Sequence, residues 1–354
     1  LLPVGISFYT FQTLSYVIDV YRGTTKPERN FIVYATFVSF FPQLVAGPIV
    51  KYKDIEQQLN ERHADSTAIR NGMLRFSAGL GKKILIANMF AKIADDLYAL
   101  DISGVAAMTA WVASLSYCVQ IYFDFSGYSD MALGLGRMFG FKFPENFNYP
   151  YISLSVREFW RRWHISLSSW FRDYLYIPLG GNRKGWFRTI INNYIVFFVT
   201  GIWHGAAWTF LGFGIWHGNF MMLERIKFFP FGKGRIHPLN WLYTMLVVNI
   251  GFIFMRAESL EKAFGMIKAL FLFQSGSFDA TVATMSYFTP FYIVLFVIAV
   301  LAATGLPHKI YTAVNTRAAG FTAFVSMLFS LAILAICFMQ LAADSYNPFI
   351  YFRF

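Results

Sequence analysis

The sequence predicts an all-α, polytopic membrane protein. Of its 354 residues, 56% are hydrophobic and 20% are aromatic, whereas only 14% are charged. Soluble domains usually carry roughly a quarter charged residues, so this balance excludes an ordinary soluble domain. The 41 phenylalanines and 9 tryptophans also exclude a disordered chain. Several apolar runs approach or reach the length of about 20 residues that a membrane-spanning helix needs.

Eight segments are candidates for membrane helices by this length rule. They cover residues 1–20, 31–50, 105–123, 190–203, 206–229, 239–255, 287–304 and 321–342. The first is more polar than the others. The segment 190–203 is short, and Gly201 and Gly205 predict a broken or re-entrant helix there. Such backbone is tolerated at membrane depth only where protein or a water-filled cavity surrounds it.

The net charge of +11 predicts which side of the membrane the loops face. In a membrane protein we attribute this excess to basic cytoplasmic loops, and we expect no nucleic-acid partner. Two stretches, 51–83 and 157–188, carry much of the positive charge. We expect both on the cytoplasmic face. Cys118 and Cys337 lie inside apolar runs, where packing is the expected role of each.

The segment 150–181 is too charged to span a membrane and too aromatic to be a free loop. Ser155 with Glu158 is typical of a helix start, and Pro178 with Gly180 and Gly181 predicts the end. At helical spacing, the polar residues of this segment fall on one stripe: Arg157, Arg161, His164, Ser168 and Arg172. The opposite stripe is apolar: Phe159, Trp163, Leu167, Trp170 and Tyr174.

Two functions fit this predicted amphipathic helix. The first is an interfacial anchor, with arginines on lipid phosphates and tryptophans at the membrane surface. The second is the mouth of an entry path, in which the Arg/His stripe receives an anionic, phosphate-bearing substrate. Guanidinium groups match phosphate oxygens, so both interpretations stay open at this point.

Two histidines, His204 and His217, lie in Trp-His-Gly motifs inside an apolar run. An ionisable residue there is costly and by default indicates a functional site. Histidine titrates near neutrality and can accept and return the proton of a hydroxyl. The alternative is a neutral core residue that donates one hydrogen bond. We favour this alternative for His217, which lies beside Asn219 and near Glu224, and a functional role for His204.

The same reasoning excludes other kinds of site. His204 and His217 are thirteen positions apart. On a helix this spacing does not place both side chains on the same face, so they are a poor pair of metal ligands and we expect no metal. The glycine motifs at 79–83 and 134–140 do not match nucleotide-binding loops. Asp124 and Asp130 fit either interfacial acids that orient an arginine or members of a polar tunnel.

Six blocks of the sequence, taken in order, resemble the membrane-bound O-acyltransferase superfamily. They are PVGISFYTFQTLSYVIDVYRG (3–23), FPQLVAGPI (41–49), QIYFDFSGYSDMALGLGRMFGF (120–141), EFWRRWHISLSSWFRDYLYIPLGGNR (158–183), GIWHGAAW (201–208) and PFIYFRF (348–354). The nearest branch is the bacterial one that O-acetylates alginate and related polysaccharides. YLYIPLGGNR favours it over the branch that supports D-alanylation of teichoic acids, and peptidoglycan O-acetylation remains close.

The resemblance implies a fold and a place in the cell. It implies a ring of membrane helices around a central tunnel in the bacterial inner membrane. Family members usually have further N-terminal spans, and this chain begins at Leu1. We therefore expect residues 1–354 to form a single membrane domain that lacks its native N-terminal spans.

The resemblance also implies substrates and site residues. Acetyl-CoA from the cytoplasm would supply the acetyl group, with no tightly bound cofactor. The acceptor would be an extracytoplasmic polysaccharide or a periplasmic SGNH-type acetyltransferase partner. His204 matches the catalytic histidine of the family and His164 its second histidine. Our hypothesis is that His204 acts as general base while His164 and the nearby arginines, Arg157, Arg161 and Arg172, bind acetyl-CoA, with Asp124 among the substrate-binding residues.

Two other classes of function remain as alternatives. One is a transporter or flippase for a polysaccharide or an acetyl-group carrier, although no inverted repeat is visible in the sequence. The other is a scaffold that recruits a periplasmic transferase. Neither of them needs His204 for catalysis.

Overall fold

The computed structural model describes residues 5–44, 47–226, 228–232, 237–272 and 276–343, and these residues form helices and loops without a strand. The block 348–354 and residues 1–4 lie outside this part. The α-helices are α1 Ile6–Tyr21, α2 Phe31–Ser39, α3 Tyr52–Asn60, α4 Ser66–Gly81, α5 Asn88–Ala99, α6 Ala107–Met138, α7 Val156–Arg162, α8 Ile165–Phe171, α9 Gly185–His204, α10 Trp208–Leu223, α11 His237–Arg256, α12 Leu260–Phe271, α13 Phe278–Met285, α14 Pro290–Ala303, α15 Leu306–Asn315 and α16 Ala319–Ala343. The all-α expectation is confirmed.

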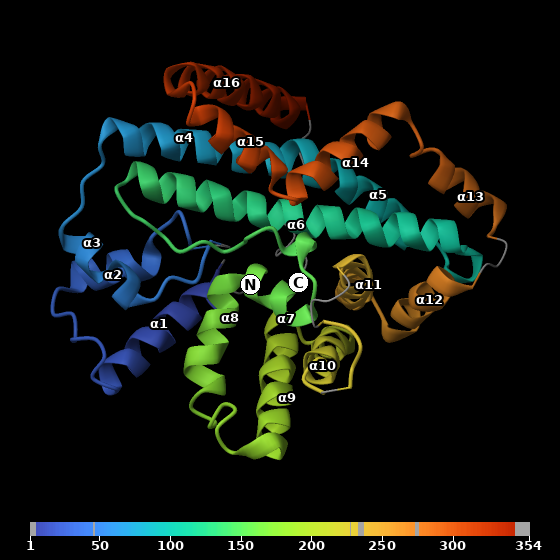
Figure 1. Ribbon diagram of the computed structural model, residues 1–354, viewed down its shortest axis with the longest axis horizontal. Coiled ribbons are helices and arrows are strands. Elements are labelled where there is room, and N and C mark those ends of the chain that lie inside the picture. The colour runs from blue at the N-terminus through green and yellow to red at the C-terminus, as the bar shows by residue number, and fades with distance from the viewer. Residues whose placement is uncertain (1–4, 45–46, 227, 233–236, 273–275, 344–354) are drawn as a thin grey trace.

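Helix α6 is the centre of the fold. It has 32 residues and is about 48 Å long at the usual rise of 1.5 Å per residue. Figure 1 shows it crossing the molecule, with α4 and α5 along one side and the α7–α10 region on the other. A π-helical turn, Lys82–Ala87, joins α4 to α5. The two helices therefore follow α6 along much of its length.

Four glycines allow α4 and α6 to approach closely. A Cβ atom on Gly72 would lie 2.6 Å from the carbonyl oxygen of Gly134. A Cβ atom on Gly79 would lie 2.5 Å from that of Gly127. Small residues at one helix face permit such contact between backbones. Gly79 and Gly134, which lie in the two glycine motifs that do not match nucleotide-binding loops, therefore serve helix packing. We call the four residues Gly72, Gly79, Gly127 and Gly134 the glycine seam.

Within the described residues, fewer helices are long and apolar enough to cross a membrane than the sequence predicted. Helices α11 and α16 are long and apolar enough to cross a membrane, and the bent pair α13 and α14 adds a third if it acts as one span. The predicted span 31–50 is wrong as a single helix, because α2 ends at Ser39. Pro42 and Pro48 follow, and proline breaks a helix by removing an N–H group.

Helices α9 and α10 form a hairpin. The helix break that the sequence predicted lies between these two helices and not within the first. Helix α9 runs without interruption for 20 residues to His204, so the segment 190–203 is not broken internally. The break falls at residues 205–207, immediately after His204. The tip of the hairpin lies at the centre of the molecule, beside α7 and α8 (Figure 1). His204 is therefore placed at a helix end.

The predicted single helix within 150–181 is wrong, although its start is correct. Ser155 caps α7, and its Oγ accepts a hydrogen bond from the Glu158 N–H at 2.9 Å. The helix then stops at Arg162, and α8 begins at Ile165 after His164, whose φ is 44°. A π-helical turn, Arg172–Tyr176, follows α8. The left-handed backbone at His164 turns the chain and removes this residue from the arginine stripe.

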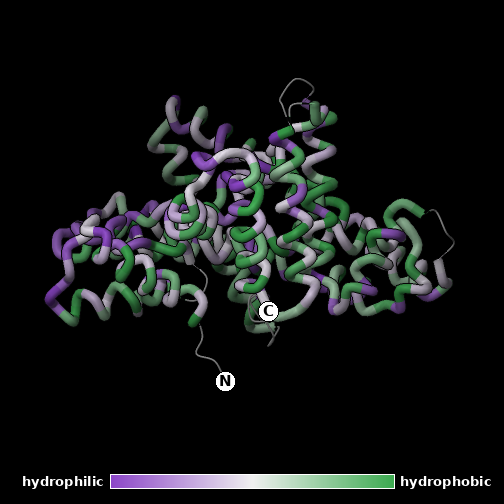
Figure 2. The backbone as a smooth tube through the Cα atoms, turned by 90° about the horizontal axis from the view of Figure 1, so that it is seen from below, coloured by the Kyte–Doolittle hydropathy of each residue, from purple (hydrophilic) through white to green (hydrophobic). Residues whose placement is uncertain are grey.

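The start of the first basic stretch contacts the second, and whether the two share a membrane face stays a prediction. Lys51 of the first forms an ion pair of 2.6 Å with Asp173 of the second. Helix α1 packs against the same region, where Trp170 Nε1 donates to the Phe11 carbonyl and the Tyr174 hydroxyl to Asp19 Oδ2. Figure 2 shows hydrophilic residues gathered at this end of the molecule, around α3.

The glycine seam makes a stability prediction. Gly79→Ala should lower the thermal unfolding midpoint of the protein in detergent micelles, because the new methyl group meets the Gly127 carbonyl oxygen. Such overpacking costs about 1–3 kcal/mol. The matched control is Gly320→Ala in α16, where a Cβ atom meets nothing within 4 Å. Circular dichroism on heating measures both, and equal midpoints would contradict the seam.

Candidate functional site

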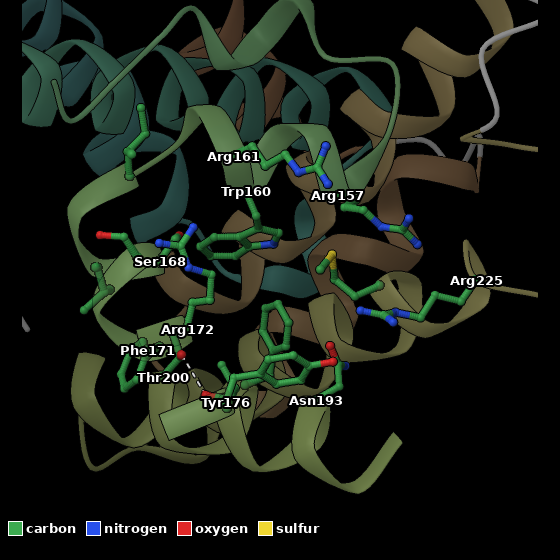
Figure 3. Close-up of a pocket in the computed structure, with 16 residues that line it drawn as sticks. Arg157, Trp160, Arg161, Ser168, Phe171, Arg172, Tyr176, Asn193, Thr200 and Arg225 are labelled. Carbon is green, nitrogen blue, oxygen red and sulfur yellow. Dashed lines mark hydrogen bonds between the residues drawn. The ribbon is translucent and has the colours of Figure 1, made fainter. Parts of the chain in front are cut away.

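A cavity of about 430 Å³ lies between α7, α8, the π-helical turn that follows α8, α9 and α10. Four arginines line it, and we call it the arginine cavity: Arg157, Arg161, Arg172 and Arg225. Figure 3 shows Arg157 and Arg225 close together on one side and Arg172 on the other. The structure therefore brings three predicted arginines to one space and adds Arg225, which the sequence analysis did not single out.

The arginine cavity is rich in hydrogen-bond donors and has no carboxylate among its lining residues. Four buried polar atoms on its walls have no hydrogen-bond partner in the described part of the chain: Arg157 Nε, Trp160 Nε1, Tyr176 Oη and Arg225 Nε. Burial, and then the charge of Arg225, lower the pKa of Arg157. Arginines gathered in this way, with unpartnered donors on the cavity wall, favour a ligand with several anionic oxygens.

Glu224 fixes the position of α7 above this cavity. Its Oε1 accepts a hydrogen bond from the Val156 N–H at 2.6 Å, and its Oε2 accepts one from the Arg157 N–H at 3.1 Å. These N–H groups start α7 and have no partner within the helix. A carboxylate at a helix start is also favoured by the helix dipole. The residue comes from the C-terminal end of α10, so it ties the hairpin to α7.

The two predicted histidines, His164 and His204, both pack against Trp203. The ring centroids of His164 and Trp203 are 6.0 Å apart, and those of Trp203 and His204 are 4.7 Å apart. Both histidines are buried. Burial, and then the nearby His204, lower the pKa of His164 well below its ordinary value. The structure thus joins residues that are 40 positions apart.

An aromatic wall separates these histidines from the arginine cavity. Trp160 lines the cavity and packs on Phe213 with centroids 6.0 Å apart. Phe213 in turn packs edge-on against His204 at 5.5 Å. His164 does not line the arginine cavity, so the expected single Arg/His stripe is wrong. The cause is the break between α7 and α8, which turns His164 inward.

His217 has surroundings that differ from those expected. Its ring is fully buried among aromatic rings, with Trp160 at 5.1 Å and Phe213 at 4.8 Å. Neither ring nitrogen has a hydrogen-bond partner in the described residues, so the expected single hydrogen bond is absent there. Asn219, its proposed neighbour, instead accepts a hydrogen bond from Tyr194.

The two acids of α6 form ion pairs with α4 and the π-helical turn after it. Asp130 Oδ1 lies 2.8 Å from Arg75, and its Oδ2 lies 2.6 Å from Lys82. This fits an acid that orients an arginine. Asp124 is buried and pairs with Lys83 at 2.6 Å. It does not line the arginine cavity, so its contact with substrate stays a prediction.

The contacts of Glu224 with α7 lead to a stability prediction. Glu224→Ala removes both acceptors from the start of α7 and should destabilise the protein by about 1.5–3 kcal/mol, the usual range for hydrogen bonds to a charged group. The thermal unfolding midpoint in micelles measures the loss. Glu258→Ala is the matched control, since that side chain is 75% exposed. A similar midpoint for both variants would show that Glu224 does not hold α7.

Comparison with known proteins matches the chain to one family and to several relatives. Residues 28–260 match the membrane-bound O-acyltransferase family. A probable alginate O-acetylase of Pseudomonas putida is 43% identical over 369 residues, which cover 100% of this chain and 75% of the relative. A peptidoglycan O-acetyltransferase of Helicobacter pylori is 40% identical, covering 76% and 57%. A teichoic acid D-alanyltransferase of Bacillus subtilis is 28% identical, covering 71% and 66%.

Proposed function

The chain belongs to the membrane-bound O-acyltransferase family, and on this premise we propose that it transfers an acetyl group from acetyl-CoA to an extracytoplasmic polysaccharide. Family membership makes it an acyltransferase and a membrane protein, and so favours an enzyme over a transporter or a scaffold. The observation that carries the proposal is the arginine cavity, which the aromatic rings of Trp160 and Phe213 separate from two buried histidines. The cavity suits a phosphate-bearing acyl donor, and the histidines suit proton transfer from a hydroxyl.

Acetyl-CoA fits the chemistry of the arginine cavity. Its phosphates would accept hydrogen bonds from Arg157, Arg161 and Arg225, two of which have an unpartnered buried Nε. Arginine binds phosphate through a planar fork of N–H groups. The apolar walls, including Trp160 and Phe197, would pack against the pantetheine arm. The thioester would then lie toward Phe213 and His204.

His204 is the proposed general base. It takes the proton of an acceptor hydroxyl as the hydroxyl oxygen attacks the acetyl carbonyl carbon. A C–O bond forms, the C–S bond of the thioester breaks, and the CoA thiolate recovers the proton from the imidazolium. His164, which also packs against Trp203, would help to orient the thioester.

The proposed acceptor is an alginate-like polysaccharide. This rests on the likeness over the whole chain to relatives whose names describe alginate O-acetylation. The acetyl group would reach the polymer directly or through a serine of a periplasmic SGNH-type partner. Peptidoglycan O-acetylation is the second candidate, because the Helicobacter pylori relative is 40% identical. The protein would cross the bacterial inner membrane several times, with its helices in a ring around a tunnel.

The catalytic role of His204 has a direct test. His204→Ala at unchanged membrane abundance should abolish ester-linked acetate on the polysaccharide, because no base removes the hydroxyl proton. Acetate released by mild alkali from the polymer measures the effect. His308→Ala, at an exposed position of α15, is the matched control and should retain acetylation. Acetate near the wild-type level in His204→Ala would refute the assignment.

The arginine cavity predicts how the enzyme distinguishes acetyl donors. Arg157→Ala and Arg161→Ala should raise KM for acetyl-CoA about tenfold or more, since a hydrogen bond to a charged group is worth about 1.5–3 kcal/mol. KM for acetyl-pantetheine, which lacks the phosphates, should not change. Arg317→Ala, at an exposed position, is the control. Equal losses for both donors would show that these arginines do not bind phosphate.

A further inference from the structure

Asn146 caps α8 from outside that helix. Its backbone carbonyl accepts a hydrogen bond from the Ile165 N–H at 2.9 Å, and its side-chain Oδ1 accepts one from the Ser166 N–H at 3.2 Å. These are the first two N–H groups of α8, which a helix cannot pair internally. Asn146 is fully buried. A residue from the segment after α6 therefore sets where α8 begins.

The residue that precedes α8 has a strained backbone. His164 has φ 44°, and Tyr149 is the other non-glycine residue with a positive φ in the described chain. This left-handed conformation costs roughly 1–2 kcal/mol for residues other than glycine. Strained residues cluster at functional sites, where the surrounding structure holds them in place. The two hydrogen bonds that Asn146 accepts from the start of α8 help to hold His164 in this conformation.

The same asparagine determines which nitrogen of His164 carries the proton. A backbone N–H group only donates, so the Asn146 atom that faces Ser166 is the oxygen. The Ser166 Oγ accepts from the Ile49 N–H and donates to this oxygen at 2.8 Å. His164 Nδ1 lies 3.2 Å from the same oxygen. Nδ1 must therefore donate, and in a neutral ring Nε2 then has a lone pair.

That second nitrogen has no partner of its own in the described chain. His164 Nε2 is buried and accepts no hydrogen bond there. The rings of Phe8, Phe125 and Trp203, from α1, α6 and α9, pack around His164, and His204 is the titratable group whose charge acts on it. An unsatisfied buried polar atom costs about 1–3 kcal/mol. Such a cost is consistent with an atom that pairs with substrate.

We infer that Asn146 is a positioning residue for acyl transfer, which holds His164 in the Nδ1–H form so that Nε2 accepts a hydrogen bond from a substrate O–H or N–H group. The inference rests on the proposed function. It also narrows the role of His164. A neutral ring with a bare Nε2 cannot donate to the thioester oxygen or to a phosphate, so His164 orients a substrate through one of that substrate's own hydrogens.

The pH dependence of Asn146→Asp tests this inference. The aspartate keeps the acceptor oxygen and adds a negative charge in contact with the His164 ring. An opposite charge at this distance raises a histidine pKa by about 1–3 units. The neutral form is lost as pH falls through the pKa, so the acid limb of kcat/KM for acetyl transfer should move to higher pH by at least one unit.

Asn148→Asp is the matched control. It introduces the same charge two residues away, at an exposed position. Its acid limb should coincide with that of the wild type. An unmoved acid limb in a folded, active Asn146→Asp variant would overturn the inference, because a cap that serves stability alone would leave the pH profile unchanged.

A spectroscopic measurement on the wild-type protein keeps the inference testable without a variant of Asn146. In protein labelled with ¹⁵N-histidine, His164 should show a protonated Nδ1 and an unprotonated Nε2 at neutral pH. Its signals are assigned by their loss in His164→Asn. A protonated Nε2 would refute the inference. Absence of acetyl transfer in the wild type would instead refute the proposed function, and the tautomer would still be read.

Discussion

The start of a short helix cannot satisfy its own backbone N–H groups, and two side chains from distant elements meet this need in the centre of the protein. Glu224, at the end of α10, accepts from the first residues of α7. Asn146, in the segment after α6, accepts from the first residues of α8. These two external caps fix the corner between α7 and α8. Arg157 and His164, which face different spaces, are placed by that corner.

The corner also explains where reasoning from the sequence succeeded and where it failed. The start of α7 follows from Ser155 and Glu158, which are local, and the arginine stripe of 157, 161 and 172 does line one cavity. The break at His164 has no such local signal. It depends on Asn146, which lies 18 residues earlier and forms its hydrogen bonds only in the folded chain. Sequence periodicity therefore placed the arginines correctly and His164 wrongly.

For the fold, too, some elements could be predicted from the sequence and others could not. Apolar runs predicted α9, α11 and α16 well, because long helices follow from composition. They made one predicted helix too long, because the segment 31–50 is mostly apolar but contains two prolines, and α2 ends at Ser39 before both of them. The glycines of α4 and α6 could be excluded from nucleotide binding, but their partners across the seam were not visible in one sequence. His204 was found by another route, the high cost of an ionisable group in an apolar run.

The hairpin of α9 and α10 links the two halves of the candidate site. His204 lies at its tip, and Glu224, which holds α7 and Arg157, lies at its far end. The hairpin is closely packed, since a Cβ atom on Gly201 would lie 2.7 Å from the Phe210 carbonyl oxygen. Its two helices therefore pack backbone to backbone near the tip. If Arg157 binds a phosphate of the donor as proposed, the hairpin would connect that phosphate to the histidine that would act on the thioester, and such positioning favours acyl transfer.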